Sequence, residues 1–140
     1  SLSSTNDKAK LLGNNIDIKD GTTIIAEEQS GGKGRLGRHW SSPKGGLWTS
    51  IILRPNIEPT NAHKITQIAS AALIKTLNSY GIDAKIKWPN DIYLNNKKIC
   101  GILTEMKCDM DRINYIIVGV GINVNINSND IPEELKDTAT

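Results

Sequence analysis

Residues 91–125 read DIYLNNKKICGILTEMKCDMDRINYIIVGVGINVN, and their pattern predicts the architecture of the sheet. Three segments within it are rich in apolar and β-branched residues and are predicted strands: 91–94, 98–107 and 113–125. The Asn95-Asn96 pair and the segment 109–112, which lie between them, have the composition of tight turns. Because strands joined by tight turns run in opposite directions, this stretch predicts an antiparallel sheet.

The preceding part of the chain adds further strands and one dominant helix. Strands are expected at 22–27, which has the composition of a buried strand, at 47–54 and at 84–88. An apolar helical stripe recurs at three- and four-residue steps: Ile65, Ile68, Ala69, Ala72, Leu73, Thr76 and Leu77. The pattern predicts a helix that Thr60 or Asn61 caps and that Gly81 ends.

Two shorter helices are expected near the ends of the chain. The first covers 6–12, with its cap among residues 3–5 and a stop at Gly13, and the second covers 132–136 in a polar tail. The order of elements predicts an α+β fold: a largely antiparallel, mixed sheet with helices packed on one face of it.

Composition limits the class of protein. The 140 residues suit one globular domain, and 38% hydrophobic with 23% charged residues is neither a disordered nor a membrane composition. No apolar run reaches the ~20 residues of a membrane helix, and no signal peptide opens the chain. Cys100 and Cys108 lie apart from His39 and His63, which favours strand-borne, partly buried thiols in a reducing cytoplasm over a metal site. A net charge of +2 is too small to indicate nucleic-acid binding.

A glycine-rich segment, 30–46, is predicted to be a loop. Gly32, Gly34 and Gly37 fit G-x-G-x-x-G, but a dinucleotide site needs a helix after the third glycine, and Trp40 and Pro43 follow instead. The loop also carries four cations: Lys33, Arg35, Arg38 and Lys44. Flexible backbone and guanidinium groups suit an anionic ligand, although a solvated turn or an RNA-binding segment has the same composition.

Polar and glycine residues in the later strands point to the same kind of site. Pro89 rigidifies the turn that carries Asn90 and Asp91, although Asn-Asp after proline is also ordinary turn chemistry. Three strand glycines, Gly101, Gly119 and Gly121, indicate a surface kept bare for a ligand.

Five segments together resemble the biotin–protein ligase family over most of the chain. They are STN at 4–6, QSGGKGRLGRHW at 29–40, KWPND at 87–91, KICGIL at 98–103 and GVGIN at 119–123. The resemblance implies a catalytic core similar to class II aminoacyl-tRNA synthetases and lipoyl ligases. It also implies two reactions: biotin and ATP give biotinyl-5'-AMP and pyrophosphate, and a lysine of a biotin carboxyl carrier protein then takes the biotinyl group.

The resemblance assigns roles by position. The biotin site is expected to include Ser4, Thr5, Gln29, Gly32, Lys33, Arg35, Lys98, Gly101 and Gly119. The ATP and adenylate site is expected to include Arg35, Arg38, Trp40, Asn90, Lys98 and Asn123. Lys98 and Arg35 are the expected catalytic residues and Asp91 the expected magnesium ligand. Lys33 stands where the family often has arginine, which keeps the charge and loses the planar fork.

Several further expectations follow. Residues 1–140 would be a catalytic domain that is incomplete at its C-terminus and has neither a DNA-binding nor a β-barrel domain. DNA and membrane are therefore not expected partners. A homodimer is a candidate assembly. Biotinyl-AMP is destroyed by water, so the segment 31–37 is expected to be disordered without ligand and to close over the adenylate. The alternatives are a lipoate or octanoate ligase of the same fold, and a non-catalytic biotin- or RNA-binding fragment.

Overall fold

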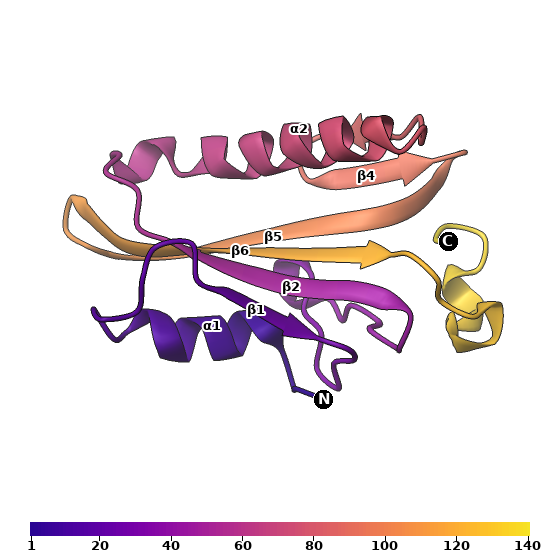
Figure 1. The fold of residues 1–140 in the computed structure, drawn as a ribbon, viewed down its shortest axis with the longest axis horizontal. Helices are drawn as coiled ribbons and strands as arrows, with labels where there is room; N and C mark the ends of the chain where they lie inside the picture. The colour runs from indigo at the N-terminus through magenta and orange to yellow at the C-terminus, as the bar shows by residue number, and fades with distance from the viewer.

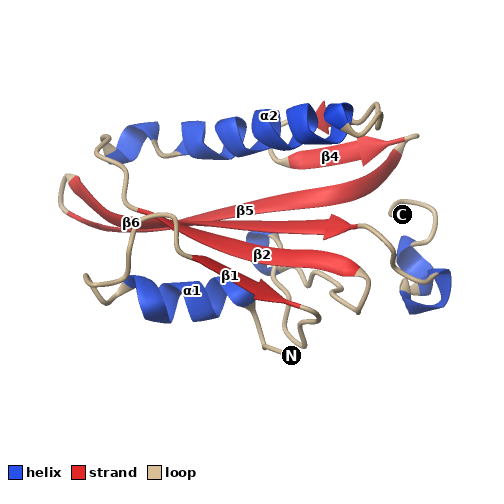
Figure 2. Ribbon diagram, viewed as in Figure 1, coloured by secondary structure: helices blue, strands red, loops and turns tan.

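The computed structural model describes residues 1–140 as six strands and two α-helices (Figures 1 and 2). The strands are β1 (Thr23–Ala26), β2 (Gly46–Leu53), β3 (Lys85–Lys87), β4 (Asp91–Leu94), β5 (Lys97–Asp109) and β6 (Arg112–Asn123). The helices are α1 (Thr5–Gly13) and α2 (His63–Ser79). Short 3-10 turns lie at Arg35–Gly37, Pro59–Asn61, Ser128–Asp130 and Glu133–Leu135.

All six strands belong to one sheet in the order β1-β2-β6-β5-β4-β3, and every pair of neighbours is antiparallel. Parallel pairing is confined to two isolated bridges, Leu2 with Gln29 and Lys98 with Ala139. The predicted α+β fold with a largely antiparallel sheet is therefore confirmed, and tight turns at 95–96 and 110–111 join its last strands as expected.

The two helices pack on opposite faces of the sheet, so the prediction that they share one face is wrong (Figure 1). Ile116 and Val118 of β6 belong to the core cluster that α2 covers. Tyr115 and Ile117, which alternate with them, pack with Ala9 of α1. Strand residues point alternately to the two faces, and β6 is apolar at both sets of positions because both faces are covered.

Several local predictions need correction. Strand 22–27 was expected to be buried, but β1 lies at the sheet edge and leaves the Ile25 side chain 65% exposed. Ala62 is the N-cap of α2 and forms no side-chain cap, while Thr60 and Asn61 lie in the 3-10 turn before it. Ile68 belongs to the predicted stripe but is 63% exposed, so the buried face of α2 is rotated away from it.

The first helix is held at both ends. Ser4 caps α1, as predicted, by accepting a hydrogen bond from the backbone N–H of Asp7. Beyond its C-terminus, the Arg54 guanidinium donates to the carbonyl oxygens of Gly13, Asn15, Ile18 and Asn114 at 2.9–3.2 Å. These bonds tie the C-terminal end of α1 and the loop after it to β6.

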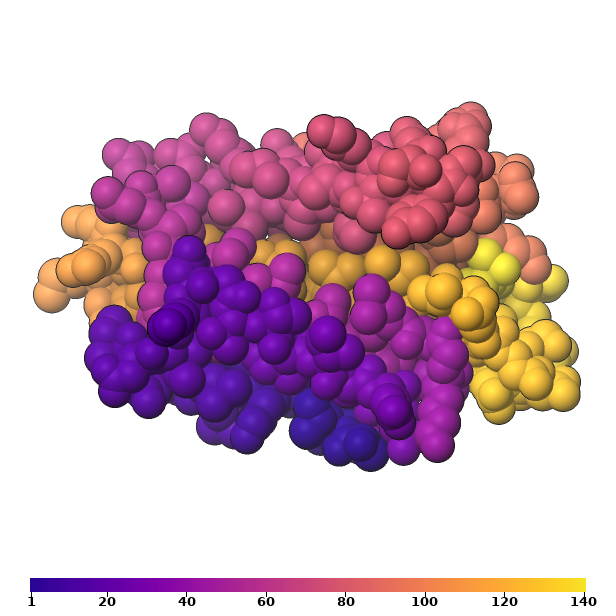
Figure 3. All heavy atoms as spheres, viewed as in Figure 1, coloured from indigo at the N-terminus to yellow at the C-terminus, as the bar shows by residue number.

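The C-terminal segment after β6 stands at one end of the molecule, beside the end of that strand (yellow in Figure 3). The expected helix at 132–136 is a shorter 3-10 turn at Glu133–Leu135. Neither helix of the chain is long and apolar enough to cross a membrane.

Candidate functional site

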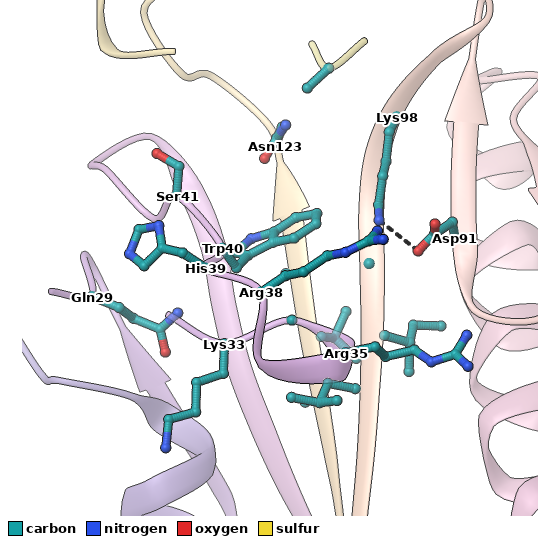
Figure 4. A pocket seen from close by; sticks show the side chains of 18 of the residues that line it. Gln29, Lys33, Arg35, Arg38, His39, Trp40, Ser41, Asp91, Lys98 and Asn123 are labelled. Atoms are coloured by element: carbon teal, nitrogen blue, oxygen red, sulfur yellow. Dashed lines mark ion pairs between the residues drawn. The ribbon is translucent and has the colours of Figure 1, made fainter. Parts of the chain in front are cut away.

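A cavity of about 550 Å³ lies on the face of the sheet that carries α1. Four parts of the chain line it (Figure 4): the glycine-rich loop, the N-terminus of α1, strands β4, β5 and β6, and the segment after β6. Most of the predicted site residues meet there: Ser4, Thr5, Gln29, Lys33, Arg35, Arg38, Trp40, Asn90, Asp91, Lys98, Gly101, Gly119 and Asn123. Gly32 does not line the cavity, because it packs against the Trp40 carbonyl and the Ser42 hydroxyl.

The indole of Trp40 forms part of the cavity floor. It lies on Gly101 and Gly121, which are paired directly across β5 and β6. A Cβ atom would come within 2.8 Å of the ring at Gly101 and within 2.6 Å of it at Gly121. At Gly119 a Cβ atom would meet the Asn6 amide oxygen instead. All three glycines line the cavity, and they also leave room for the side chains of Trp40 and Asn6. That they are kept bare for a ligand stays a prediction.

Lys98 reaches the cavity because of a β-bulge. Tyr93 pairs with Lys98 and Ile92 with Cys100, so Ile99 is an extra residue in β5. Ile99 and Cys100 both enter the core under α2, and the alternation is thereby shifted so that Lys98 faces the cavity with Asp91. The Lys98 Nζ lies 2.7 Å from the Asp91 Oδ1 and 4.9 Å from the centre of the Trp40 ring (Figure 4).

Three of the four loop cations line the cavity, and each takes a different position. The Arg35 guanidinium donates to the Asn90 Oδ1 at 2.8 Å, and buried Asn90 in turn donates to the Ile102 carbonyl at 3.0 Å. Arg38 makes no side-chain hydrogen bond and points across the cavity toward the side of Lys98 (Figure 4). Lys33 points the other way, with its Nζ 2.7 Å from a carboxylate oxygen of Asp7 on α1.

A buried network of neutral polar groups lies at the opposite end of the cavity from Lys98. The Gln29 Oε1 accepts from the Thr5 backbone N–H at 2.7 Å, and the Gln29 Nε2 donates to the Ser42 hydroxyl at 2.9 Å. Ser50 lies 2.8 Å from the Thr5 hydroxyl and donates to the Asn6 Oδ1 at 2.6 Å. Ser42, Ser50 and Asn6 were missed by the sequence analysis; a buried serine in the middle of a strand was the available signal.

The C-terminal segment forms a further wall that the sequence analysis did not anticipate. Its backbone pairs with Lys98, whose N–H donates to the Thr138 carbonyl at 2.8 Å and whose carbonyl accepts from Thr140 at 3.2 Å. Apolar side chains of this segment line the cavity: Ile126, Ile131, Pro132 and Leu135. Apolar residues isolated in an otherwise polar tail were the sequence signal that could have predicted this wall.

Carboxylates are scarce in the cavity. Asp91 and Asp130 are the acidic residues among those that line it, and no group of three or more His, Cys, Asp or Glu side chains gathers anywhere in the chain. Mg²⁺ commonly takes one or two carboxylates, with substrate phosphates and water completing its shell. Asp91 fits one such position, and the remaining ligands would have to come with a phosphate-bearing ligand.

The Cys100 thiol, in the core under α2, is unreactive at neutral pH. Burial raises its pKa from 9.0 to about 12, the nearby Lys98 charge lowers it and the Asp91 charge raises it. A thiol with so high a pKa is not a nucleophile at neutral pH. Cys108 is exposed, and the two cysteines are not joined.

Comparison with known proteins defines the family. Residues 1–123 match the sequence profile of the biotin/lipoate A/B protein ligase family. The chain is 47% identical to the bifunctional ligase/repressor BirA of Bacillus subtilis, over 99% of this chain and 43% of that protein. A biotin–[acetyl-CoA-carboxylase] ligase of Paracoccus denitrificans is 36% identical over 69% of this chain and 42% of its own length. The chain belongs to the biotin/lipoate A/B protein ligase family.

Solved structures agree. The biotin protein ligase of Aquifex aeolicus in complex with biotin and ATP superposes with a TM-score of 0.75 at 37% identity, covering 99% of this chain and 55% of that one. The Leishmania major biotin protein ligase in complex with biotinyl-5-AMP gives a TM-score of 0.74 at 29% identity, covering 99% of this chain and 59% of that one. The chain thus spans about half the length of these relatives.

Proposed function

We propose that this chain is the catalytic part of a biotin–protein ligase. It activates biotin with ATP to biotinyl-5'-AMP and transfers the biotinyl group to a lysine of a biotin carboxyl carrier protein. The observation that carries the proposal is the polarity of the cavity. Neutral hydrogen-bonding groups around Thr5 and Gln29 lie at one end, where the Lys33 charge is paired with Asp7. The cations Arg35, Arg38 and Lys98 lie at the other end. A ligand with an uncharged polar head and a distant carboxylate fits this arrangement.

The formation of biotinyl-AMP needs the charges of the carboxylate and the phosphates to be neutralised, and it needs no general base. A carboxylate is already anionic at pH 7, so its attack on the α-phosphate of ATP is opposed chiefly by repulsion between two anions. Lys98, which its ion pair with Asp91 and the Trp40 ring hold in one place, is positioned to stabilise charge on the carboxylate and the phosphate. Mg²⁺ that arrives with ATP would reduce the phosphate charge further, with Asp91 as its protein ligand.

The second step needs the adenylate to survive until the acceptor arrives. The lysine amine forms a bond to the acyl carbon, the bond from that carbon to the phosphate oxygen breaks, AMP leaves, and the amine proton passes to solvent. Water attacks the same carbon, so a closed loop over the cavity protects the intermediate. Closure of the segment 31–37 on ligand binding is part of the proposal, as is a cytoplasmic location, which the two unpaired cysteines favour.

Biotin-dependent exchange of pyrophosphate into ATP tests the first step directly, with lipoate in place of biotin as the comparison. Lys98→Ala is expected to reduce exchange far more than it reduces biotin affinity, because the Lys98 charge matters most as charge builds on phosphorus. Lys107→Ala, on the same strand and paired with Asn14 at 2.8 Å, is the matched control. Absence of exchange with the unsubstituted chain would refute the proposal, and exchange with lipoate alone would favour the lipoate ligase. Equal losses of exchange and affinity in Lys98→Ala would make Lys98 a binding residue only.

A further inference from the structure

A second cavity of about 250 Å³ adjoins the first. It lies between the first turns of α2, the Trp88-Pro89 turn and the middle of β5. Arg35 and Asn90 line both cavities, and the 2.8 Å hydrogen bond between them stands where the cavities meet. Figure 4 shows the Arg35 side chain below Lys98, running toward the side of the first cavity on which Asp91 lies. The steps proposed above for biotin and ATP use the first cavity and leave the second unassigned.

The lining of the second cavity suits a polypeptide. Thr66, Gln67 and Thr104 supply neutral polar groups, and the Trp88 side chain is 67% exposed at its rim. Tryptophan and arginine are the residue types that most often dominate protein–protein binding energy. Its volume of about 250 Å³ is less than half the 550 Å³ of the first cavity and suits a single side chain.

The charge around the second cavity selects the kind of polypeptide. No carboxylate lines it and Arg35 does, while Lys87, the residue before Trp88, lines the adjoining first cavity. Opposite charges at an interface steer the encounter and fix the orientation of the partner. A segment with acidic residues beside its target lysine therefore fits this rim better than a basic one.

We propose that the second cavity receives a side chain of the acceptor polypeptide close to its target lysine, and that the lysine itself enters the first cavity past Arg35. This inference rests on the proposed function. An acceptor protein cannot enter a cavity of about 550 Å³ and has to be held at its rim, and the second cavity is the recess that shares residues with the first. In an extended segment, side chains two residues apart point to the same side and lie about 7 Å from each other, so two of them reach adjacent recesses.

The test separates the two chemical steps. Gln67→Trp fills the second cavity from α2, and Trp88→Ala removes its exposed platform; Lys75→Trp, an exposed position of α2 outside the cavity, is the control. Each variant is assayed for biotin-dependent pyrophosphate exchange. Each is also given preformed biotinyl-AMP and assayed for transfer to the isolated biotin acceptor domain of a carboxylase and to hydroxylamine.

Gln67→Trp and Trp88→Ala are expected to keep exchange and transfer to hydroxylamine within about twofold, and to slow transfer to the acceptor domain by at least about tenfold, which corresponds to about 1.4 kcal/mol. Lys75→Trp is expected to match the unsubstituted chain throughout. Unchanged transfer to the acceptor domain in both cavity variants would overturn the inference. A parallel loss of exchange would also overturn it, because the cavity would then serve the small substrates. Absence of exchange and transfer in the unsubstituted chain would mark failure of the proposed function instead.

Discussion

The contact between Trp40 and the paired glycines can be perturbed by a single methyl group. In Gly121→Ala the new Cβ atom would lie 2.6 Å from the Trp40 Nε1, and ordinary contact begins at 3.4 Å, so the ring has to move by about 0.8 Å. Overfilling a packed site in this way costs about 1–3 kcal/mol. The ring belongs to the glycine-rich loop, so we expect the strain to favour the open loop and to weaken biotin binding by about 5- to 150-fold.

Calorimetric titration with biotin measures this loss, and tryptic cleavage after Arg35 and Arg38 reports how open the loop is. The matched control is a double-mutant cycle with Trp40→Ala. Without the indole, the added methyl group has nothing to displace, so Gly121→Ala should then cost less than about 0.5 kcal/mol. Unchanged affinity in Gly121→Ala, or strictly additive effects in the cycle, would show that the indole does not rest on this strand in solution.

Three other outcomes are expected. Arg54→Ala should lower the free energy of unfolding by about 2 kcal/mol in thermal denaturation, since carbonyls at the end of α1 lose a charged donor; a change below about 0.5 kcal/mol would contradict this. Burial raises the pKa of the Cys100 thiol from 9.0 to about 12, so the unfolded chain loses this proton at lower pH than the folded chain does. The free energy of unfolding should therefore fall as the pH rises from 9 to 12, by up to about 1.4 kcal/mol per pH unit. Cys100→Ala should lessen that fall and Cys108→Ala should not. Lys33→Met should speed biotin dissociation by about two- to fivefold, because the loop loses its ion pair with Asp7; the same change in an Asp7→Asn background should add nothing.

Much of the sheet could be predicted because its determinants are local. Segments rich in apolar and β-branched residues, separated by turn residues at 95–96 and 109–112, predict successive antiparallel strands without reference to the rest of the chain. The placement of the helices could not be predicted in this way. A run such as Tyr115-Ile116-Ile117-Val118 is apolar on both faces, and nothing in it says which helix covers which face.

The sequence predicted many of the residues that line the cavity but not which contacts they make with one another. Family resemblance named residues that the structure gathers around one cavity, yet their contacts depend on distant parts of the chain. Lys33 bonds to Asp7 because the fold brings α1 beside the loop, and a long flexible side chain does not reveal its partner from sequence. The bulge at Ile99, which turns Lys98 into the cavity, is likewise invisible in the residue pattern alone.

The alternation of side chains along β6 allows this strand only one pairing register in the folded chain. Val118 and Val120 fill the interior beneath α2, while Gly119 and Gly121 make room for Asn6 and the indole on the other side. A strand that slipped by one position would bury glycine where bulk is needed and drive valine into the indole. A molecule with β6 in a shifted register would thus lose its core packing and its ligand cavity together, so partly active misfolded forms should not accumulate.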